Sequence, residues 1–139
     1  MILLWYVEYL CGILVIVFRK SYFFNNINNI MNGGNFMSVI KVSNENFNSE
    51  VISSDKPVLI DFYADWCGPC KMLSPVVDKL AEEHSEFKVV KVNVDENPDL
   101  AGSYQVMSIP TLVVIENGKE VNRSMGLQSK QDILNLVSR

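Results

Sequence analysis

The chain has 139 residues, which is room for one domain of ordinary size and a tail. Its composition, 48% hydrophobic and 20% charged residues, is that of a globular protein, and its net charge of -4 without a cluster of Lys or Arg argues against a nucleic-acid partner. Three cysteines are too few for a small domain held together by several disulfides.

The first 36 residues differ in composition from the rest of the chain. Residues 2–18 are almost continuously apolar and are followed by Arg19 and Lys20. No Lys or Arg precedes this run, and the first alanine of the chain is Ala64, so the basic start and the small-residue cleavage site of a secretory signal are both missing. We therefore do not expect a cleavable signal peptide.

An uncleaved membrane anchor is one open interpretation of this segment. The apolar run just reaches the lower limit of membrane-spanning length, about 17 residues, although Glu8 inside it would cost a few kcal/mol. The basic pair after the run would place the remainder of the chain in the cytoplasm.

The other interpretation is that translation starts at Met37. The pair Gly33-Gly34 can be encoded by a purine-rich sequence at ribosome-binding distance from that codon, and the Asn, Ile and Phe bias of residues 21–36 is typical of translated noncoding DNA rich in A and T. We hypothesise that Met37 is the initiator, and we divide the chain into an N-terminal extension, residues 1–36, and a domain, residues 37–139.

From Ser38 onward the sequence alternates between strand-like and helix-like patterns. The run 57–64 is apolar apart from Asp61, which favours a buried strand, and Asn117-Gly118 predicts a hairpin turn. The order strand-helix-strand-helix-strand-helix-strand-strand-helix implies a mixed sheet with helices on both faces. The expected strands are 39–42, 57–64, 87–94, 111–115 and 119–125, and the expected helices are 43–51 (capped by Ser43 or Asn44), 70–83, 98–104 and a last helix capped by Ser129.

The helical patterns also predict which side chains point inward. Phe47 and Val51 share one face of the first helix. The inward residues of the other long helices are Met72, Leu73, Val76, Val77 and Leu80 in the helix 70–83, and Ile133, Leu134 and Val137 in the last one.

Cys67 and Cys70 form a Cys-Gly-Pro-Cys motif between an expected strand and an expected helix. Two thiols separated by two residues can close a small disulfide and open it again, which is a two-electron redox reaction. Half of a zinc site is the alternative, but a closed site needs four ligands and only Cys11 and His84 remain. We expect no metal.

Over residues 38–139 the chain resembles the thioredoxin family. Trp-Cys-Gly-Pro-Cys with a downstream Ile-Pro-Thr is far more specific than a bare pair of cysteines. The resemblance implies an α/β thioredoxin fold, with a central mixed sheet of about five strands flanked by about four helices and the dithiol at the start of the second helix. The matching motifs are Asp61–Lys71, Lys91–Asp95, Ser108–Thr111, Asn117-Gly118 and Gly126.

At the start of a helix, free N–H groups and the helix dipole favour the thiolate of Cys67, which is therefore the expected nucleophile. Cys70, one turn further in, would resolve the mixed disulfide. Asp61 would lose hydration in its apolar strand, which raises the pKa of a carboxyl, and the resemblance implies that it accepts the proton of Cys70. Lys91 matches the family's lysine partner of that carboxylate. The alternatives are a surface Asp on an edge strand and an ordinary solvated Lys.

Pro110 matches the family's cis-proline, which faces the dithiol. The resemblance implies a flat, largely apolar docking surface beside Cys67, and a cis bond that leaves backbone groups of the preceding residue free to pair with a substrate chain. Two positions depart from the common pattern: Tyr63 replaces a frequent Trp, and Ser108 a frequent Gly. The expected docking residues are Trp66, Gly68, Pro69, Ile109, Pro110 and Gly126.

These features predict a protein-disulfide reductase that works in cell redox homeostasis. The resemblance implies thioredoxin reductase as the partner that delivers electrons from NADPH, since the chain has no flavin or nucleotide motif and is expected to bind no cofactor. Disulfide-containing proteins are the expected substrates, and a cytoplasmic monomer is the expected state. Two alternatives remain: a membrane-tethered reductase or oxidase if residues 1–36 form an anchor, and a non-catalytic binding subunit.

Overall fold

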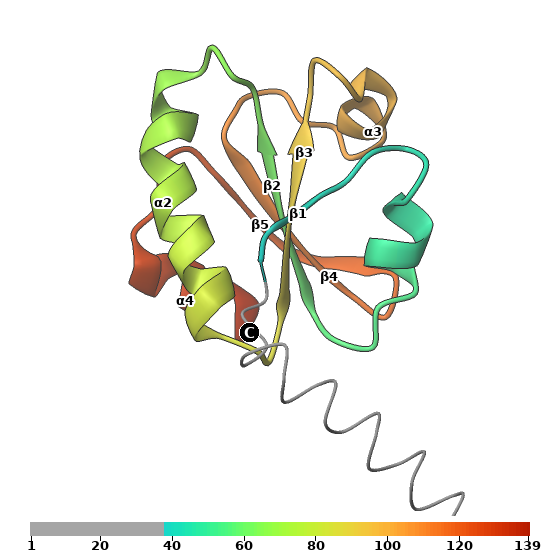
Figure 1. Ribbon diagram of the computed structural model, residues 1–139, viewed down its shortest axis with the longest axis vertical. Helices are drawn as coiled ribbons and strands as arrows, with labels where there is room; N and C mark the ends of the chain where they lie inside the picture. Colours follow the sequence, from blue (N-terminus) through green and yellow to red (C-terminus); the bar gives the residue numbers. More distant parts are fainter. Residues whose placement is uncertain (1–37) are drawn as a thin grey trace, which may run out of the picture. The chain divides into compact units, whose positions relative to one another are not determined.

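The computed structural model describes residues 38–139, and the predictions for residues 1–36, Cys11 and Met37 lie outside them (Figure 1). Within that range the chain forms a five-stranded sheet in the order β1-β3-β2-β4-β5. β1 and β2 both run parallel to β3, whereas β4 is antiparallel to β2 and β5 is antiparallel to β4. The predicted mixed sheet is confirmed. Its strands are β1 (Ile40–Lys41), β2 (Val58–Tyr63), β3 (Lys88–Asn93), β4 (Thr111–Glu116) and β5 (Lys119–Met125).

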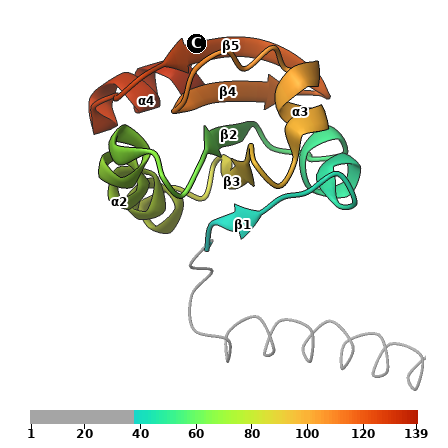
Figure 2. The ribbon, with the colours of Figure 1, turned by 90° about the horizontal axis from the view of Figure 1, so that it is seen from above.

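Helical segments cover both faces of the sheet, as the predicted element order requires. The long helix α2 (Gly68–Glu83) and the terminal helix α4 (Lys130–Val137) lie on one face, and α3 (Pro98–Ser103) and the short helix η1 (Asn48–Ile52) lie on the other (Figure 2). None of the helices in residues 38–139 is long and apolar enough to cross a membrane.

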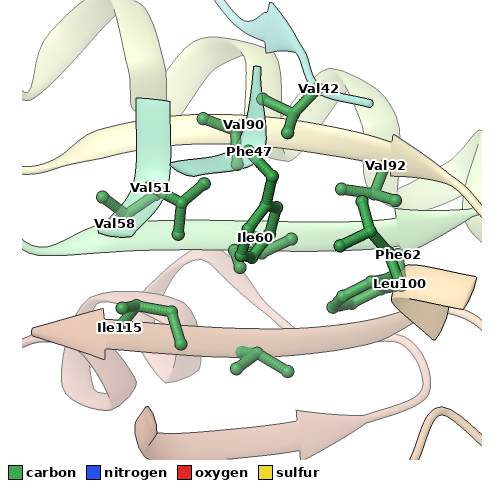
Figure 3. Packing of buried hydrophobic residues seen from close by; sticks show 11 residues of the cluster. Val42, Phe47, Val51, Val58, Ile60, Phe62, Val90, Val92, Leu100 and Ile115 are labelled. Atoms are coloured by element: carbon green, nitrogen blue, oxygen red, sulfur yellow. The ribbon is translucent and has the colours of Figure 1, made fainter. Parts of the chain in front are cut away.

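The side chains of β2 alternate between the two faces and so connect two hydrophobic cores. Val58, Ile60 and Phe62 pack on the side of η1 and α3, together with residues such as Val51 (Figure 3). Leu59 packs on the opposite side, in the cluster that includes Leu73 and Val77 of α2. Asp61, which has the same parity as Leu59, therefore faces α2 from the middle of an otherwise apolar strand.

The first helix differs from its prediction. In place of an α-helix from Ser43 to Val51, the chain makes a turn and then a π-helical segment, in which the Ser53 N–H donates to the Asn48 carbonyl (2.9 Å). Polar side chains compete for the backbone here, since Asn46 Oδ1 accepts the Ser43 N–H at 2.8 Å. Phe47 and Val51 are nevertheless buried, as predicted.

The helix α2 buries Leu73, Val77 and Leu80, a stripe with the spacing i, i+4, i+7, as predicted. The prediction for Met72 was wrong, because this side chain is 63% exposed. Met72 lies one residue to the side of the buried stripe and near the start of the helix.

The terminal helix α4 starts where the sequence predicted. The Ser129 hydroxyl accepts the Asp132 N–H (3.2 Å), and the Asp132 carboxylate accepts the Ser129 N–H in return, which completes a capping box. Ile133 is fully buried against the sheet, and Leu134 and Val137 are partly buried beside it. This helix closes the same face that α2 covers.

Candidate active site

The dithiol lies where β2 has ended and α2 begins. Cys67 is the N-cap residue of α2, and Cys70 lies in its first turn, with Pro69 at the start of the helix. The two sulfurs are joined in a disulfide, with the Cα atoms 5.3 Å apart, and the Cys70 N–H donates to Cys67 Sγ at 3.2 Å. The predicted placement of the pair at the start of a helix is confirmed, and an N–H of the first turn points at Cys67.

Cys67 borders an open groove of about 490 Å³. Every residue of the lining is uncharged. A Cβ atom on Gly68 would meet nothing within 4 Å in residues 38–139, apart from its chain neighbours and the backbone of its own helix, so the space beside this residue is open. The lining consists of Trp66, Cys67, Gly68, Pro69, Val94, Val106, Met107, Ser108 and Ile109.

One wall of this groove is the exposed ring of Trp66, which is 70% accessible. Its Nε1–H donates to Asp95 Oδ2 at 2.8 Å, and this contact fixes the plane of the ring beside Cys67. An exposed aromatic ring with one polar anchor offers apolar area at little entropic cost. The sequence analysis did not assign Asp95 a contribution, because nothing in its spacing points to Trp66.

The opposite wall is the segment that leads into β4. The Ile109–Pro110 bond is cis, as the resemblance implies, and the Ile109 carbonyl oxygen lies 3.8 Å from Cys67 Sγ. Pro110 itself is buried, and its carbonyl accepts the Gly126 N–H at 2.8 Å. Gly126, with φ of +81°, thus supports the wall without lining the groove.

Besides Cys67, the groove includes four residues that were not among the expected docking residues: Val94, Val106, Met107 and Ser108. Met107 is 91% exposed and stands at the rim, the position that an isolated hydrophobic side chain before Ile-Pro could have suggested. Val94 and Val106 could not be found from the sequence, because they come from the ends of other elements.

Cys70 borders a different space, a pocket of about 180 Å³ enclosed between the sheet and α2. Unlike the groove, this pocket is lined by ionisable and polar side chains from three strands and the helix. Its lining consists of Lys41, Asp61, Tyr63, Cys70, Ser74 and Lys91. The disulfide thus separates an uncharged groove from a charged pocket.

Asp61 is the most buried ionisable group of this pocket, with 1% of its surface exposed. Its Oδ1 atom has no hydrogen-bond partner in the part of the chain that the structure describes. Burial raises the pKa of Asp61 from 3.8 to about 6, against an opposing effect of the Lys91 charge and with a smaller increase from Asp78. A carboxyl with this pKa is suited to accept and release a proton near neutral pH.

Lys91 lies directly opposite Asp61 in the register of β2 and β3, and 11% of its side chain is exposed. Its ion pair, however, is with another residue: Nζ donates to Asp78 Oδ1 at 2.6 Å and to Ser74 Oγ at 2.6 Å. No hydrogen bond joins Lys91 to Asp61 among the described contacts. The sequence analysis missed Ser74 and Asp78, whose four-residue spacing on α2 was the one available signal.

No group of three or more His, Cys, Asp and Glu side chains within residues 38–139 is arranged to hold a metal ion. His84, which the sequence analysis weighed as a fourth ligand, instead pairs its Nδ1 with Glu86 Oε1 (2.6 Å) and stacks on Phe87.

Comparisons with known proteins agree with this geometry. The family model for Thioredoxin matches residues 38–139. The thioredoxin of Porphyra purpurea is 47% identical over 104 residues, which cover 74% of this chain and 97% of that protein, and the thioredoxin of Rickettsia felis is 43% identical over 99 residues, 70% of this chain and 94% of that protein. A solved structure of a mutant thioredoxin from Halobacterium salinarum NRC-1 superposes with a TM-score of 0.68 at 40% identity, covering 76% of this chain and 92% of that one.

Proposed function

The chain belongs to the thioredoxin family and is a protein-disulfide oxidoreductase acting by thiol–disulfide exchange, and on that premise we propose that Cys67 and Cys70 work in the reducing direction. The observation that carries the proposal is the asymmetry of the pair: Cys67 borders the open groove, and Cys70 borders the pocket that contains Asp61. In this proposal Cys67 meets the substrate and Cys70 gives up its proton. Gly68 and Pro69 between them leave Cys67 without a cationic neighbour inside the motif, as suits a reductant.

In the first step the Cys67 thiolate attacks one sulfur of a substrate disulfide. A bond forms between Cys67 and that sulfur, the substrate disulfide breaks, and the other sulfur leaves as a thiolate that takes a proton from water. The N–H of Cys70, which points at Cys67 Sγ, and the start of α2 favour the thiolate before the attack.

In the second step Cys70 resolves the mixed disulfide. Its thiol gives its proton to the Asp61 carboxylate, its sulfur attacks Cys67, and the Cys67–Cys70 disulfide forms as the second substrate sulfur leaves. The substrate has then gained two electrons. The raised pKa of Asp61 supports this role, because a base with a pKa near the working pH transfers protons efficiently in both directions.

Substrate docking is assigned to the groove. Trp66, Gly68, Pro69 and Ile109 line it beside Cys67, and an extended segment of the substrate would pair with the backbone of Ile109. Pro110 and Gly126 do not line the groove. They are proposed to fix the position of the Ile109 backbone through the hydrogen bond from the Gly126 N–H to the Pro110 carbonyl.

A reduced dithiol must be regenerated after each cycle. We assign this to a separate reductase that draws electrons from NADPH, in keeping with the family and with the lack of a nucleotide-binding motif in the sequence. The proposed substrates are disulfide-containing proteins, and the chain is proposed to act as a monomeric electron carrier.

The compartment depends on the first 36 residues. With Met37 as the start, residues 37–139 would form a cytoplasmic domain; with residues 1–36 translated, the same domain would be tethered to a membrane from its cytoplasmic side. The intact mass of the native protein tests this, since a mass that includes residues 1–36 would contradict the start at Met37.

The direction of the reaction is tested by equilibrating the full chain with glutathione buffers and measuring the reduced fraction by thiol labelling. We expect the pair to be more reducing than glutathione, and an oxidising potential would overturn the proposal. Reduction of insulin is the activity test, with Cys67→Ser as the control, which should have no activity above background.

A further inference from the structure

We propose that Ser74 and Asp78 of α2 are positioning residues that hold the Lys91 ammonium away from Asp61, and so keep Asp61 free as a base beside Cys70. This inference rests on the proton-acceptor role of Asp61 proposed above. It adds two residues to the site that neither the sequence analysis nor the comparisons assigned.

Asp61 and Lys91 are neighbours across two adjacent strands of the sheet. Asp61 and Lys91 are partners in the parallel register of β2 and β3, so their side chains leave neighbouring strands on the same face, about 5 Å apart at the backbone. Of the two residues in register with Lys91, Lys41 on β1 and Asp61 on β2, Asp61 is the one that carries a carboxylate. Within residues 38–139, the Lys91 ammonium nevertheless donates to Ser74 and Asp78 of α2, and Asp61 Oδ1 has no hydrogen-bond partner.

Two side chains of α2 bind the Lys91 ammonium. Ser74 and Asp78 are four residues apart and therefore lie on one side of α2. The Ser74 hydroxyl accepts from Lys91 Nζ at 2.6 Å and donates to Asp78 Oδ2 at 3.3 Å, while Asp78 Oδ1 accepts from Lys91 at 2.6 Å. The three side chains satisfy one another, and the network does not include Asp61.

The consequence for Asp61 follows from the charges around it. The groups that face it are Lys91 of β3, Lys41 of β1, Tyr63 of its own strand and, from α2, Cys70 and Asp78; its partner on β4 is the apolar Leu112. An ammonium held at α2 gives the site a positive charge without a hydrogen bond to the carboxylate. If the ammonium turned to Asp61, it would stabilise the carboxylate and make it a weaker base.

The test is the titration of Asp61 in the oxidised full chain, followed by the ¹³C NMR shift of its carboxyl carbon. The wild-type midpoint is expected near the Asp61 pKa of about 6. In Asp78→Asn the midpoint of the Asp61 titration should move down by about 1 pH unit or more, since Lys91 loses its ion pair with Asp78 and its ammonium turns to Asp61. Asp78→Glu should restore the wild-type midpoint, and Ser74→Ala should give a smaller shift in the same direction.

A double-mutant comparison separates positioning from simple removal of a negative charge. If Asp78 acts through Lys91, Asp78→Asn should shift the midpoint far less in a Lys91→Met background than in the wild type. An unchanged midpoint in Asp78→Asn, an upward shift, or an equal shift in both backgrounds would overturn the inference.

The titration requires no turnover, so it fails or succeeds independently of the reductase assignment. A chain that titrates as expected and yet does not reduce insulin would contradict only the proposed function. Asp78 is half exposed, with 49% of its side chain accessible, so its substitution is expected to leave the fold intact.

Discussion

The groove beside Cys67 and the pocket beside Cys70 differ in charge and in access to solvent, although one turn of helix separates the two cysteines. The groove is lined by uncharged residues, and its rim residues Trp66 and Met107 are largely exposed. The pocket contains Lys41, Asp61 and Lys91, of which Asp61 is almost fully buried. One disulfide therefore borders an open, uncharged groove on one side and a pocket with a buried carboxyl on the other.

The largest expected effect comes from Cys70→Ser, which removes the sulfur on the pocket side. Cys67 should still attack a substrate disulfide, but no thiol remains to resolve the mixed disulfide. We expect turnover to be lost and one substrate to be trapped per chain, visible as a stoichiometric adduct in the intact mass. Cys67→Ser is the matched control and should form no adduct. An adduct of equal yield on Cys67→Ser would show that Cys70 attacks substrate as well and would contradict the assigned roles.

Asp61→Asn should slow the second step and spare the first. A general base contributes about 10²–10⁴-fold, so release of reduced substrate at neutral pH should fall by at least about 10²-fold. The measurement is stopped-flow kinetics with a fluorescent disulfide substrate, which separates the attack from the release. If both steps slowed equally, Asp61 would not serve Cys70 in particular.

Asp61→Asn should also change the free energy of unfolding, by an amount that depends on pH. The folded protein holds the Asp61 proton up to a pKa of about 6, whereas the unfolded chain releases it near 3.8. The folded state therefore binds more protons between these values, and the free energy of unfolding falls as the pH rises through this window, by about 3 kcal/mol in total.

Above pH 7, oxidised Asp61→Asn should accordingly be more stable than the wild type by up to about 3 kcal/mol, and this advantage should vanish below about pH 4. Urea unfolding at the two pH values measures it. A constant difference at both would mean that the Asp61 charge does not cause it.

The smallest effect is expected on the groove side. Met107→Glu puts a charge at the rim and should raise KM for a substrate with apolar residues next to its disulfide by about tenfold, with little change in kcat. The control is Val121→Glu, since Val121 is also exposed (51%) but does not line the groove. Equal effects of both substitutions would indicate general charge repulsion rather than docking.

The fold was largely predictable because its signals are local. The apolar run before the dithiol, the Asn117-Gly118 turn and the Ser129 cap each specify one element, and all three occur as predicted. The exception, η1, lies in a segment rich in Asn and Ser, whose side chains bond to the backbone and weaken the α-helical preference.

The site was predictable only where a motif covers it. Cys67, Cys70 and Pro110 belong to such motifs, whereas Ser74 and Asp78 meet Lys91 only through the packing of α2 on β3. The family resemblance paired Lys91 with Asp61 but could not show which carboxylate the Lys91 ammonium bonds to in this chain. That choice depends on side-chain geometry across two elements.

The central claim is that Cys67, beside the groove, attacks the substrate disulfide and that Cys70, beside the pocket, resolves the mixed disulfide. Alkylation of the reduced full chain tests it most directly. A limiting amount of iodoacetamide at neutral pH, followed by peptide mass mapping, reports the reactivity of each cysteine separately and keeps Cys11 apart from the pair. The account predicts that Cys67 is modified first and that Cys70 stays largely unmodified. Modification of Cys70 as fast as Cys67 would contradict it.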